Sequence, residues 1–199
     1  MFIHDFKSIF VHIPKTGGTS ITYAMEDVKK KFKHRPDHRR LTEYLNASPK
    51  NFWKYHKFTV VRDPVERELS LYNHLVHKRR DNKREIIDHS FTEYLNNIKN
   101  DKNFYLEFSF MKRKKDNLKF KYIYADQSDY ITLNNQICVD QIIRFEGLDF
   151  GFQLLCDKVG LKYKKLTHHR PSSKKTIASL EDIKLIKEIR KKDYELLSY

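Results

Sequence analysis

A lysine, two glycines and three hydroxyl-bearing residues follow one another after an apolar stretch near the N-terminus. The segment reads SIFVHIPKTGGTSI, and its candidate anion-binding residues are Lys15, Thr16, Gly17, Gly18, Thr19 and Ser20. Glycines let the backbone turn tightly and bring N–H groups toward an anion, and a helix beginning there adds unpaired N–H groups. The pattern therefore predicts an anion-binding loop between a strand and a helix, although the G-x-x-x-x-G-K-[ST] order of ATP-type phosphate loops is absent.

A second candidate follows the apolar segment KFTVV. Arg62 comes directly after that segment, and Asp63 and Pro64 are typical of a helix start. Ser70 lies further along the predicted helix. Arginine suits phosphate because its planar guanidinium can bond two oxygens at once. Each pattern alone also fits a helix cap beside a surface cation, but together they favour one ligand with two separated anionic groups.

The elements that must position these residues alternate between strands and helices. Apolar or β-branched runs predict strands at 9–13, 57–61 and 141–145. Helical spacing and capping residues predict helices from the first loop to about 32, at 41–45, around 52, and at 64–78, 91–98, 148–159 and 180–197. Before the last helix, Ser179 and Asp182 resemble a capping pair. This order predicts an α/β fold, a P-loop-like three-layer sandwich with a central, mostly parallel sheet flanked by helices, in a single domain over residues 1–199. Ligands of such folds bind at the carboxyl ends of the strands.

The composition narrows the class of partner. A chain of 199 residues with 39% hydrophobic residues can bury a core, and its formal net charge of +14 favours anionic partners. The sequence has no apolar run of about 20 residues that would span a membrane, and its first residues do not resemble a signal peptide. The two cysteines, Cys138 and Cys156, do not form a CxxC pair, so neither a disulfide framework nor a metal site is expected.

The segments IFVHIPKTGGTSI and FTVVRDPVERELSLY together resemble the PAPS-dependent sulfotransferases, in particular carbohydrate O-sulfotransferases of the 2-O and chondroitin type, from the Golgi and from bacteria. In that family the first loop binds the 5′-phosphosulfate of 3′-phosphoadenosine 5′-phosphosulfate (PAPS), and the R-x-P-x-x-R-x-x-S-x-Y segment binds its 3′-phosphate. The resemblance implies that the six loop residues bind the phosphosulfate and that Arg62 and Ser70 bind the other end. It also implies in-line transfer to a carbohydrate hydroxyl, with Lys15 stabilising the leaving phosphate and no metal required.

Later segments resemble the same family more weakly. They are ADQSDYI, IIRFEGLDFGFQLLCDKVGL and the basic stretch HHRPSS, which lacks the asparagine common in the family at that place. The resemblance implies that this stretch closes over the nucleotide through Arg170, Ser172, Ser173 and Lys174. RFEG (144–147) is expected to form a strand end or a buried ion pair, not to take part in chemistry.

A general base must remove the acceptor proton, and a pKa near neutrality suits histidine. Bacterial members of the family that this chain resembles contain a segment similar to H-x-T-x-x-E upstream of the R-x-P motif. This makes His38 in DHRRLTEYL the first candidate. His34 is the second candidate, and Glu43 is a carboxylate alternative. The competing interpretation is that a histidine in a basic segment is a solvated surface group.

Basic residues surround the candidate base. Arg35, Arg39 and Arg40 are candidates for binding the acceptor, and the runs KRKK and HKRRDNKR add positive charge. Taken singly, each run fits a solvated face; taken together, they favour a polyanionic carbohydrate acceptor. Nucleic acid is not the expected partner, and the oligomeric state cannot be deduced. The expected location is the cytoplasm for a complete chain, or the Golgi lumen for an excised catalytic domain.

Two other functions compete with sulfuryl transfer. A nucleotide kinase with a divergent phosphate loop would need a lysine after the glycines and a carboxylate for magnesium at a strand end. Asp63 follows a strand but occupies a helix-cap position. A non-catalytic nucleic-acid-binding module would explain the charge and the aromatic residues, but the sequence contains no recognised nucleic-acid-binding motif.

Overall fold

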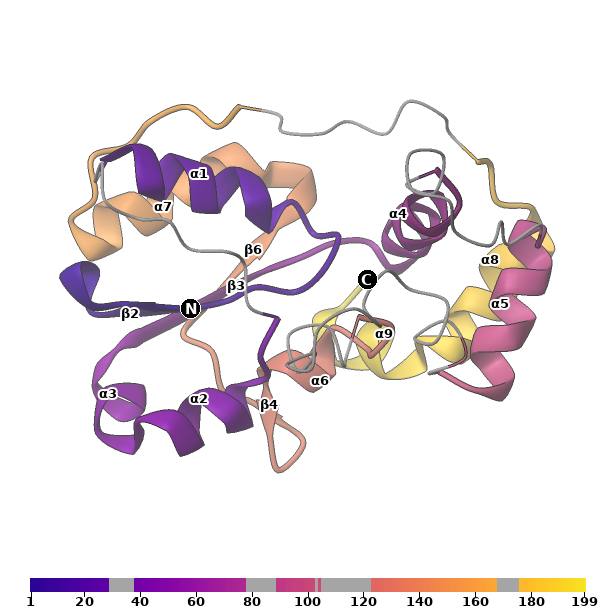
Figure 1. The fold of residues 1–199 in the computed structure, drawn as a ribbon, viewed down its shortest axis with the longest axis horizontal. Helices are drawn as coiled ribbons and strands as arrows, with labels where there is room; N and C mark the ends of the chain where they lie inside the picture. The colour runs from indigo at the N-terminus through magenta and orange to yellow at the C-terminus, as the bar shows by residue number, and fades with distance from the viewer. Residues whose placement is uncertain (29–37, 78–88, 103, 105–122, 168–175) are drawn as a thin grey trace. The chain divides into compact units, whose positions relative to one another are not determined.

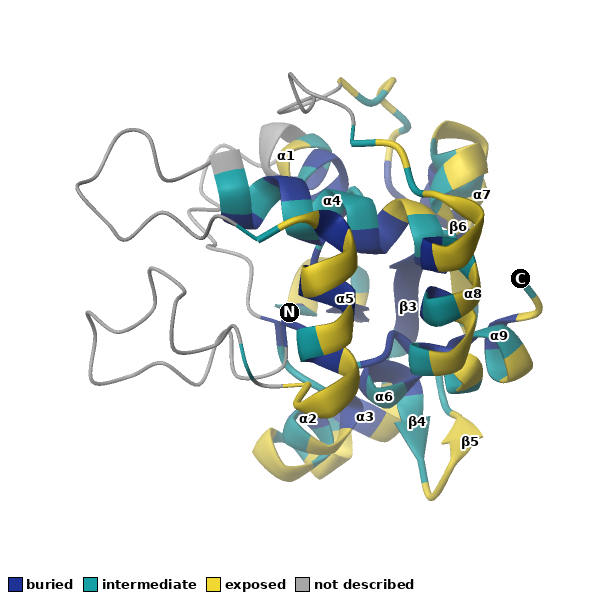
Figure 2. Ribbon diagram, turned by 90° about the vertical axis from the view of Figure 1, so that its right-hand side faces the viewer, coloured by how far each residue is buried: buried dark blue, intermediate teal, exposed yellow. Residues whose placement is uncertain are grey.

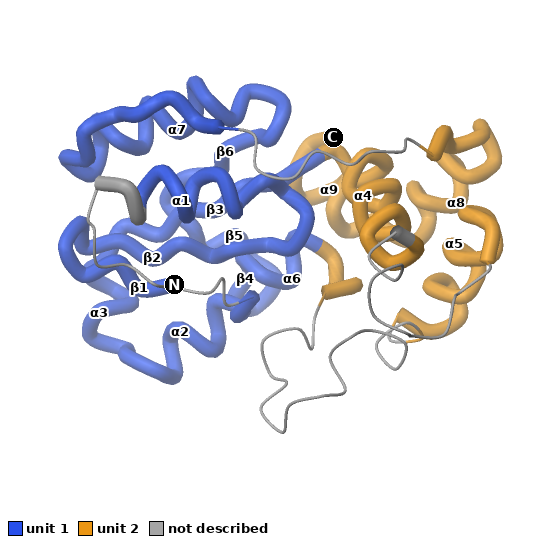
Figure 3. The backbone as a smooth tube through the Cα atoms, turned by 45° about the horizontal axis from the view of Figure 1, so that its top comes forward, with its two compact units in different colours: residues 1–62, 127–170 blue, residues 63–126, 171–199 orange. Residues whose placement is uncertain are grey.

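The computed structural model describes residues 1–28, 38–77, 89–102, 104, 123–167 and 176–199. The chain divides into two compact units, each assembled from two separate segments (Figure 3). Unit 1 comprises Met1–Arg62 and Gln127–Arg170, and unit 2 comprises Asp63–Asp126 and Pro171–Tyr199. A single domain over 1–199 stays a prediction. No helix in these described ranges is long and apolar enough to cross a membrane.

Unit 1 is built on a mostly parallel sheet. The strand order is β1 (Phe2–Ile3), β2 (Ser8–Val11), β3 (His56–Val61) and β6 (Gln141–Arg144). β1 runs antiparallel to β2, whereas β2, β3 and β6 are parallel. The predicted α/β class and the three predicted strands are therefore confirmed. Because these three strands are parallel neighbours, their carboxyl ends lie along one edge of the sheet.

Helices cover both faces of this sheet (Figure 1). α1 (Gly18–Val28) and α7 (Leu148–Val159) lie on one side, and α2 (Leu41–Ala47) and α3 (Pro49–Lys54) lie on the other. Phe10, Phe58 and Ile143, one from each parallel strand, pack into a core with residues of α1 and α7. A Cβ at Gly151 of α7 would lie 2.5 Å from the Cγ2 atom of Ile143, so glycine is required for this close approach of α7 to β6.

Short elements complete unit 1. They are the 3₁₀ helices η1 (His4–Phe6) and η5 (Phe145–Gly147), helix α6 (Ser128–Ile131), and a hairpin of β4 (Thr132–Leu133) and β5 (Gln136–Ile137). Asn134 and Asn135 form the hairpin turn with φ angles of 50° and 61°, a conformation that asparagine tolerates well. The strands β1, β4 and β5 were not predicted, because two residues are too few to show an alternating pattern.

Unit 2 is helical. Its helices are α4 (Pro64–His77), α5 (Phe91–Asn100), α8 (Leu180–Ile189) and α9 (Lys191–Leu197). α5 and α8 bury one face and expose the other (Figure 2). Asp63 caps α4 as predicted, because its Oδ1 accepts a hydrogen bond of 3.0 Å from the Glu66 N–H. Ser179 and Asp182 form the predicted capping box of α8.

The last helical segment departs from the prediction. A single helix to residue 197 is wrong, because the chain leaves helical geometry at Arg190, where φ is −107° and ψ is 23°. The Arg190 side chain is fully buried and bonds to Glu68 and Asp126. These distant partners fix the side chain inside the unit, whereas helical periodicity alone would have carried the helix through this position.

Candidate functional site

The predicted anion-binding loop connects β2 to α1 and contains two residues in the left-handed region. Lys15 has a φ of 68° and Gly17 a φ of 82°. Glycine adopts this conformation without penalty, whereas for a lysine it is strained by about 1 to 2 kcal/mol. Such strain persists where the surrounding structure holds it, and it often accompanies function. The sequence predicted tight turning at the glycines but not at Lys15.

The loop is closed by its own hydrogen bonds. The Thr16 hydroxyl is buried and donates to the Ile13 carbonyl at 3.0 Å, and the Ser20 N–H donates to the Gly17 carbonyl at 3.0 Å. Ser20 is also buried, whereas Lys15 and Thr19 are partly exposed. Lys15 and Thr19 are therefore the loop side chains best placed for a ligand that approaches from solvent.

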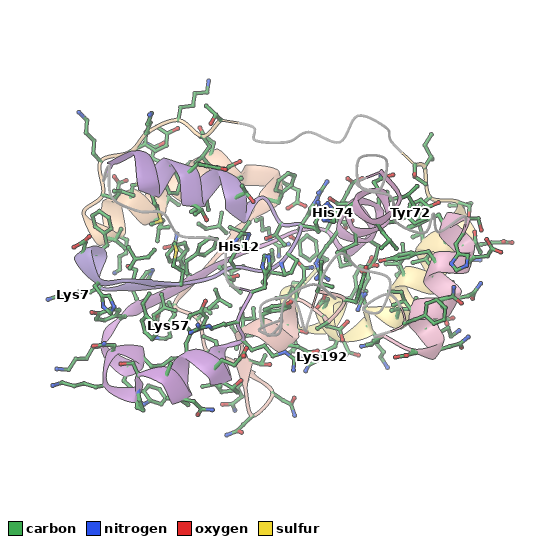
Figure 4. All side chains as sticks on the ribbon, viewed as in Figure 1. Lys7, His12, Lys57, Tyr72, His74 and Lys192 are labelled. Carbon is green, nitrogen blue, oxygen red and sulfur yellow. The ribbon has the colours of Figure 1, made fainter. Side chains whose placement is uncertain are left out.

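His12 (labelled in Figure 4) packs against Gly18, the first residue of α1. Its ring is 3% exposed and stacks on Phe10, with 5.2 Å between ring centroids. A Cβ at Gly18 would lie 2.5 Å from the Cδ2 atom of His12, so a larger residue at Gly18 would displace the ring. Burial first, then the charges of His38 and the N-terminus, hold the pKa of His12 well below its usual value. The buried ring is therefore neutral.

The predicted base, His38, lies beside His12. Its Nδ1 atom is 2.8 Å from the His12 carbonyl oxygen, and the two rings meet edge to face at 4.7 Å. A carbonyl can only accept a hydrogen bond, so Nδ1 must carry the proton. In a neutral imidazole the lone pair is then on Nε2, the form that a general base requires. The fold thus brings His38 to the residue at which the loop begins.

Arg62 follows the last residue of β3, on the strand next to β2. The Arg62 N–H donates to the Gln127 side-chain oxygen at 2.9 Å, and the Gln127 side-chain nitrogen donates to the Arg62 carbonyl at 2.8 Å. Gln127 is fully buried. Its amide group therefore holds the Arg62 backbone on both sides.

Phe145 joins Arg62 to the loop. It is the first residue after β6, and the guanidinium carbon of Arg62 lies 4.4 Å from the centroid of its ring. A Cβ at Gly17 would lie 2.7 Å from two carbons of the same ring. We call the loop 12–20 together with His38, Arg62 and Phe145 the strand-end site. Sequence reasoning missed Phe145 and Gln127, although Phe145 is the last residue of a predicted strand and the strand-end argument applies to it as well.

Other predicted residues have structural partners in unit 1. The Glu43 Oε2 atom accepts a hydrogen bond of 2.8 Å from the Arg40 N–H in the first turn of α2, which explains this carboxylate as part of a helix cap. The Arg40 guanidinium lies 3.9 Å from the Asp129 carboxylate. Arg39 is partly exposed. The proposed roles of these three residues stay predictions.

Ser70 lies on α4 in unit 2, so its predicted role at the 3′-phosphate stays a prediction. Arg67, the second arginine of the same motif, is 1% exposed and donates to the carbonyls of Ala125 and Ile123 at 3.1 and 3.2 Å. Arg67 thus connects α4 to the segment that contains Ile123 and Ala125. Six further candidates lie outside the described residues: His34, Arg35, Arg170, Ser172, Ser173 and Lys174.

A mostly buried group of charged and polar side chains connects distant segments of unit 2. Arg190 pairs with Glu68 at 2.8 Å and with Asp126 at 2.9 Å, Lys102 also pairs with Asp126, and the Tyr94 hydroxyl donates to Glu68. We call these five residues the Arg190 cluster. Burial raises the pKa of Tyr94 well above its usual value, and the Glu68 carboxylate raises it further. For Asp126, burial alone would raise the pKa, but Arg190 and Lys102 outweigh it and lower the pKa.

Among the comparisons with known proteins, one gives a match, to a family model. No curated protein and no solved structure matches the chain. A family model described as the sulfotransferase family matches residues 1–199. The matched range includes the loop after β2 and the arginine after β3, the two segments on which the resemblance was based. The chain therefore belongs to the sulfotransferase family.

Proposed function

We propose that this protein transfers the sulfuryl group of PAPS to a hydroxyl of a carbohydrate. The observation that carries the proposal is the placement of the Lys15 loop and Arg62 at the ends of two adjacent parallel strands, both in contact with Phe145. PAPS carries anionic groups at its 5′ and 3′ positions, so it is a ligand with two separated negative ends. The loop would hold the phosphosulfate and Arg62 the 3′-phosphate.

In the proposed reaction, the acceptor hydroxyl oxygen attacks the sulfur in line with the leaving phosphate. A bond forms between sulfur and the acceptor oxygen, and the bond between sulfur and the bridging oxygen breaks. The electron pair leaves on the 5′-phosphate of 3′-phosphoadenosine 5′-phosphate (PAP). Lys15 stabilises the charge that develops on this phosphate, a contribution of the kind that can change rates by about 10² to 10³. No step of this proposed transfer requires a metal ion.

His38 would take the proton from the acceptor hydroxyl. Its hydrogen bond to the His12 carbonyl supports this role, because it orients the ring and leaves the lone pair on Nε2. The neutral state of His12 supports it further, because a second positive charge beside His38 would oppose protonation of the base.

The acceptor class rests on the basic character of the chain. A formal net charge of +14 favours a carbohydrate that already carries carboxylate or sulfate groups. Arg39 and Arg40, which precede α2 shortly after His38, are the described residues proposed to contact it. Transfer of radiolabelled sulfate from PAPS to a panel of charged and neutral glycans would identify the acceptor. A preference for neutral glycans would contradict the polyanionic part of the proposal.

Retention on immobilised PAP, together with sulfate transfer, tests the donor site. Lys15→Ala and Arg62→Ala should each abolish both, whereas Lys50→Ala, which removes an exposed lysine of α3, should change neither. Lys15→Gly separates charge from strain, because glycine adopts the left-handed φ of position 15 without penalty. This variant should fold at least as stably as the unmodified protein and still lose transfer. Normal retention and transfer by both alanine variants would overturn the proposal.

A further inference from the structure

Arg62 is held at its backbone and at its guanidinium group by Gln127 and Phe145, two residues outside both predicted anion-binding segments. Gln127 bonds to the N–H and the carbonyl of Arg62, and the Phe145 ring lies under the guanidinium. We infer that Gln127 and Phe145 are positioning residues that aim Arg62 at the 3′-phosphate of the nucleotide. This inference rests on the proposed function and deepens it, because it concerns how the protein selects a nucleotide with a 3′-phosphate.

The Gln127 contact restrains the backbone of Arg62, from which its side chain extends. Both hydrogen bonds are shorter than 3 Å, and the glutamine is fully buried, so its amide has little freedom to move. Arg62 is the residue at which the chain leaves β3, where the regular sheet pairing between Val61 and Arg144 ends. The glutamine thus supplies the backbone partners that the sheet no longer provides.

The Phe145 contact restrains the guanidinium group at the end of the Arg62 side chain. A cation held over an aromatic face is attracted to the ring without using its N–H donors, so these donors can still bind a phosphate. An arginine restrained in this way loses less conformational entropy when it binds a phosphate, because much of that entropy has already been lost in the folded protein. Phe145 therefore improves affinity without touching the ligand.

The same ring also contacts the loop. A Cβ at Gly17 would approach two Phe145 carbons to 2.7 Å, so the loop backbone packs directly against the ring. The two predicted anion-binding groups are thus spaced by one aromatic side chain. A nucleotide with anions at both its 5′ and 3′ ends benefits from this fixed spacing, whereas a nucleotide with only a 5′-phosphate does not. The positioning residues should therefore affect the ratio of affinities for these two ligands.

Calorimetric titration of the purified protein with PAP and with adenosine 5′-monophosphate tests this. Phe145→Leu should lower the ratio of PAP affinity to monophosphate affinity by roughly 3- to 10-fold. Phe145→Tyr, which keeps the aromatic face, should restore most of the ratio. Phe150→Leu is the matched control, because Phe150 lies on α7 with 68% of its surface exposed, and it should keep the unmodified ratio. A general loss of folded protein would lower both affinities together and leave the ratio unchanged.

Gln127→Met should lower the same ratio, whereas Gln136→Met, at an exposed position of β5, should not. An unchanged ratio in both Phe145→Leu and Gln127→Met would overturn the inference. If the unmodified protein binds no PAP, the proposed function itself fails, and this outcome is distinct from PAP binding that ignores the two substitutions.

Discussion

The strand-end site of unit 1 and the Arg190 cluster of unit 2 treat positive charge in opposite ways. In the cluster, Arg190 is fully buried and bonds to two carboxylates and to the Tyr124 carbonyl. In the strand-end site, Arg62 is partly exposed and rests on an aromatic ring, and Lys15 lies partly exposed on a strained loop. The first arrangement uses cations to hold chain segments together. The second presents them where a ligand can reach.

The two arginines of the R-x-P-x-x-R motif show the same contrast within one short segment. Arg67 donates to two backbone carbonyls and is almost fully buried, whereas Arg62 is partly exposed at a strand end. The R-x-P-x-x-R motif therefore contains both a candidate ligand-binding residue, Arg62, and a residue with a structural role, Arg67. Substitutions should separate the two classes: those in the strand-end site should change activity at constant stability, and those in unit 2 should change stability first.

Among substitutions that leave PAP binding intact, the largest effect is expected at His38. His38→Asn keeps a side-chain N–H that can donate to the His12 carbonyl but lacks the basic nitrogen, so sulfate transfer should fall by about 10² to 10⁴. PAP affinity and the thermal midpoint should stay near those of the unmodified protein. His4→Asn, at an exposed position of unit 1, serves as the control. Near-normal transfer by His38→Asn would remove His38 as the base.

Arg190→Met should have the largest effect on stability. It leaves the buried carboxylates of Glu68 and Asp126 without their arginine, which should lower the free energy of unfolding by about 3 to 5 kcal/mol. Lys191→Met changes the neighbouring, exposed lysine of a surface pair and should cost less than about 1 kcal/mol. Urea unfolding followed by circular dichroism measures both. Equal effects of the two substitutions would show that the Arg190 cluster contributes little.

Arg67→Met and Arg62→Met test the contrast inside the motif. Arg67→Met removes the donor to the buried Ile123 carbonyl and to the partly buried Ala125 carbonyl, and should destabilise the protein by about 1 to 3 kcal/mol. Arg62→Met should change stability by no more than about 0.5 kcal/mol, yet it should lose PAP binding. Parallel urea unfolding and PAP titration distinguish the two outcomes. A stable Arg67 variant beside a destabilised Arg62 variant would reverse the assignment.

The smallest effect concerns pH. The pKa of Asp126 is lowered in the folded protein, so its contribution to stability is fully present above the unfolded value of about 3.9 and is lost as pH falls through the lower, folded value. Urea midpoints should therefore decrease below about pH 3.9, and less steeply in Asp126→Asn. Asp157→Asn, at an exposed position of α7, should keep the unmodified pH dependence. An identical slope in Asp126→Asn would contradict the lowered pKa.

Local signals in the sequence were sufficient for most of the fold. α7 has the predicted bounds, and Gly160 ends it in a left-handed conformation with a φ of 71°, as expected for a C-terminal glycine. The capping residues Asp63 and Ser179 likewise predicted the starts of α4 and α8. These features depend on residues within a few positions of one another, so they can be recognised without knowing the tertiary structure.

Contacts between distant residues could not be predicted in this way. Gln127 is 65 residues from Arg62, and Arg190 is 122 residues from Glu68, so neither pairing leaves a periodic trace. The break at Arg190 is the clearest case, because the helical pattern continues through it and only its buried partners explain the change. The left-handed Lys15 also depends on its surroundings, since lysine has no preference for that conformation.

The sequence by itself therefore determined the family, the order of the three parallel strands and of most helices, and the residue types at the ends of β2 and β3. Tertiary structure decided which cations serve the fold and which lie at the candidate site. The reason is physical: a buried cation must find carboxylates or carbonyls to offset its lost hydration, as Arg190 and Arg67 do. Arg62 stays partly exposed because the parallel register ends its strand beside the ring of Phe145.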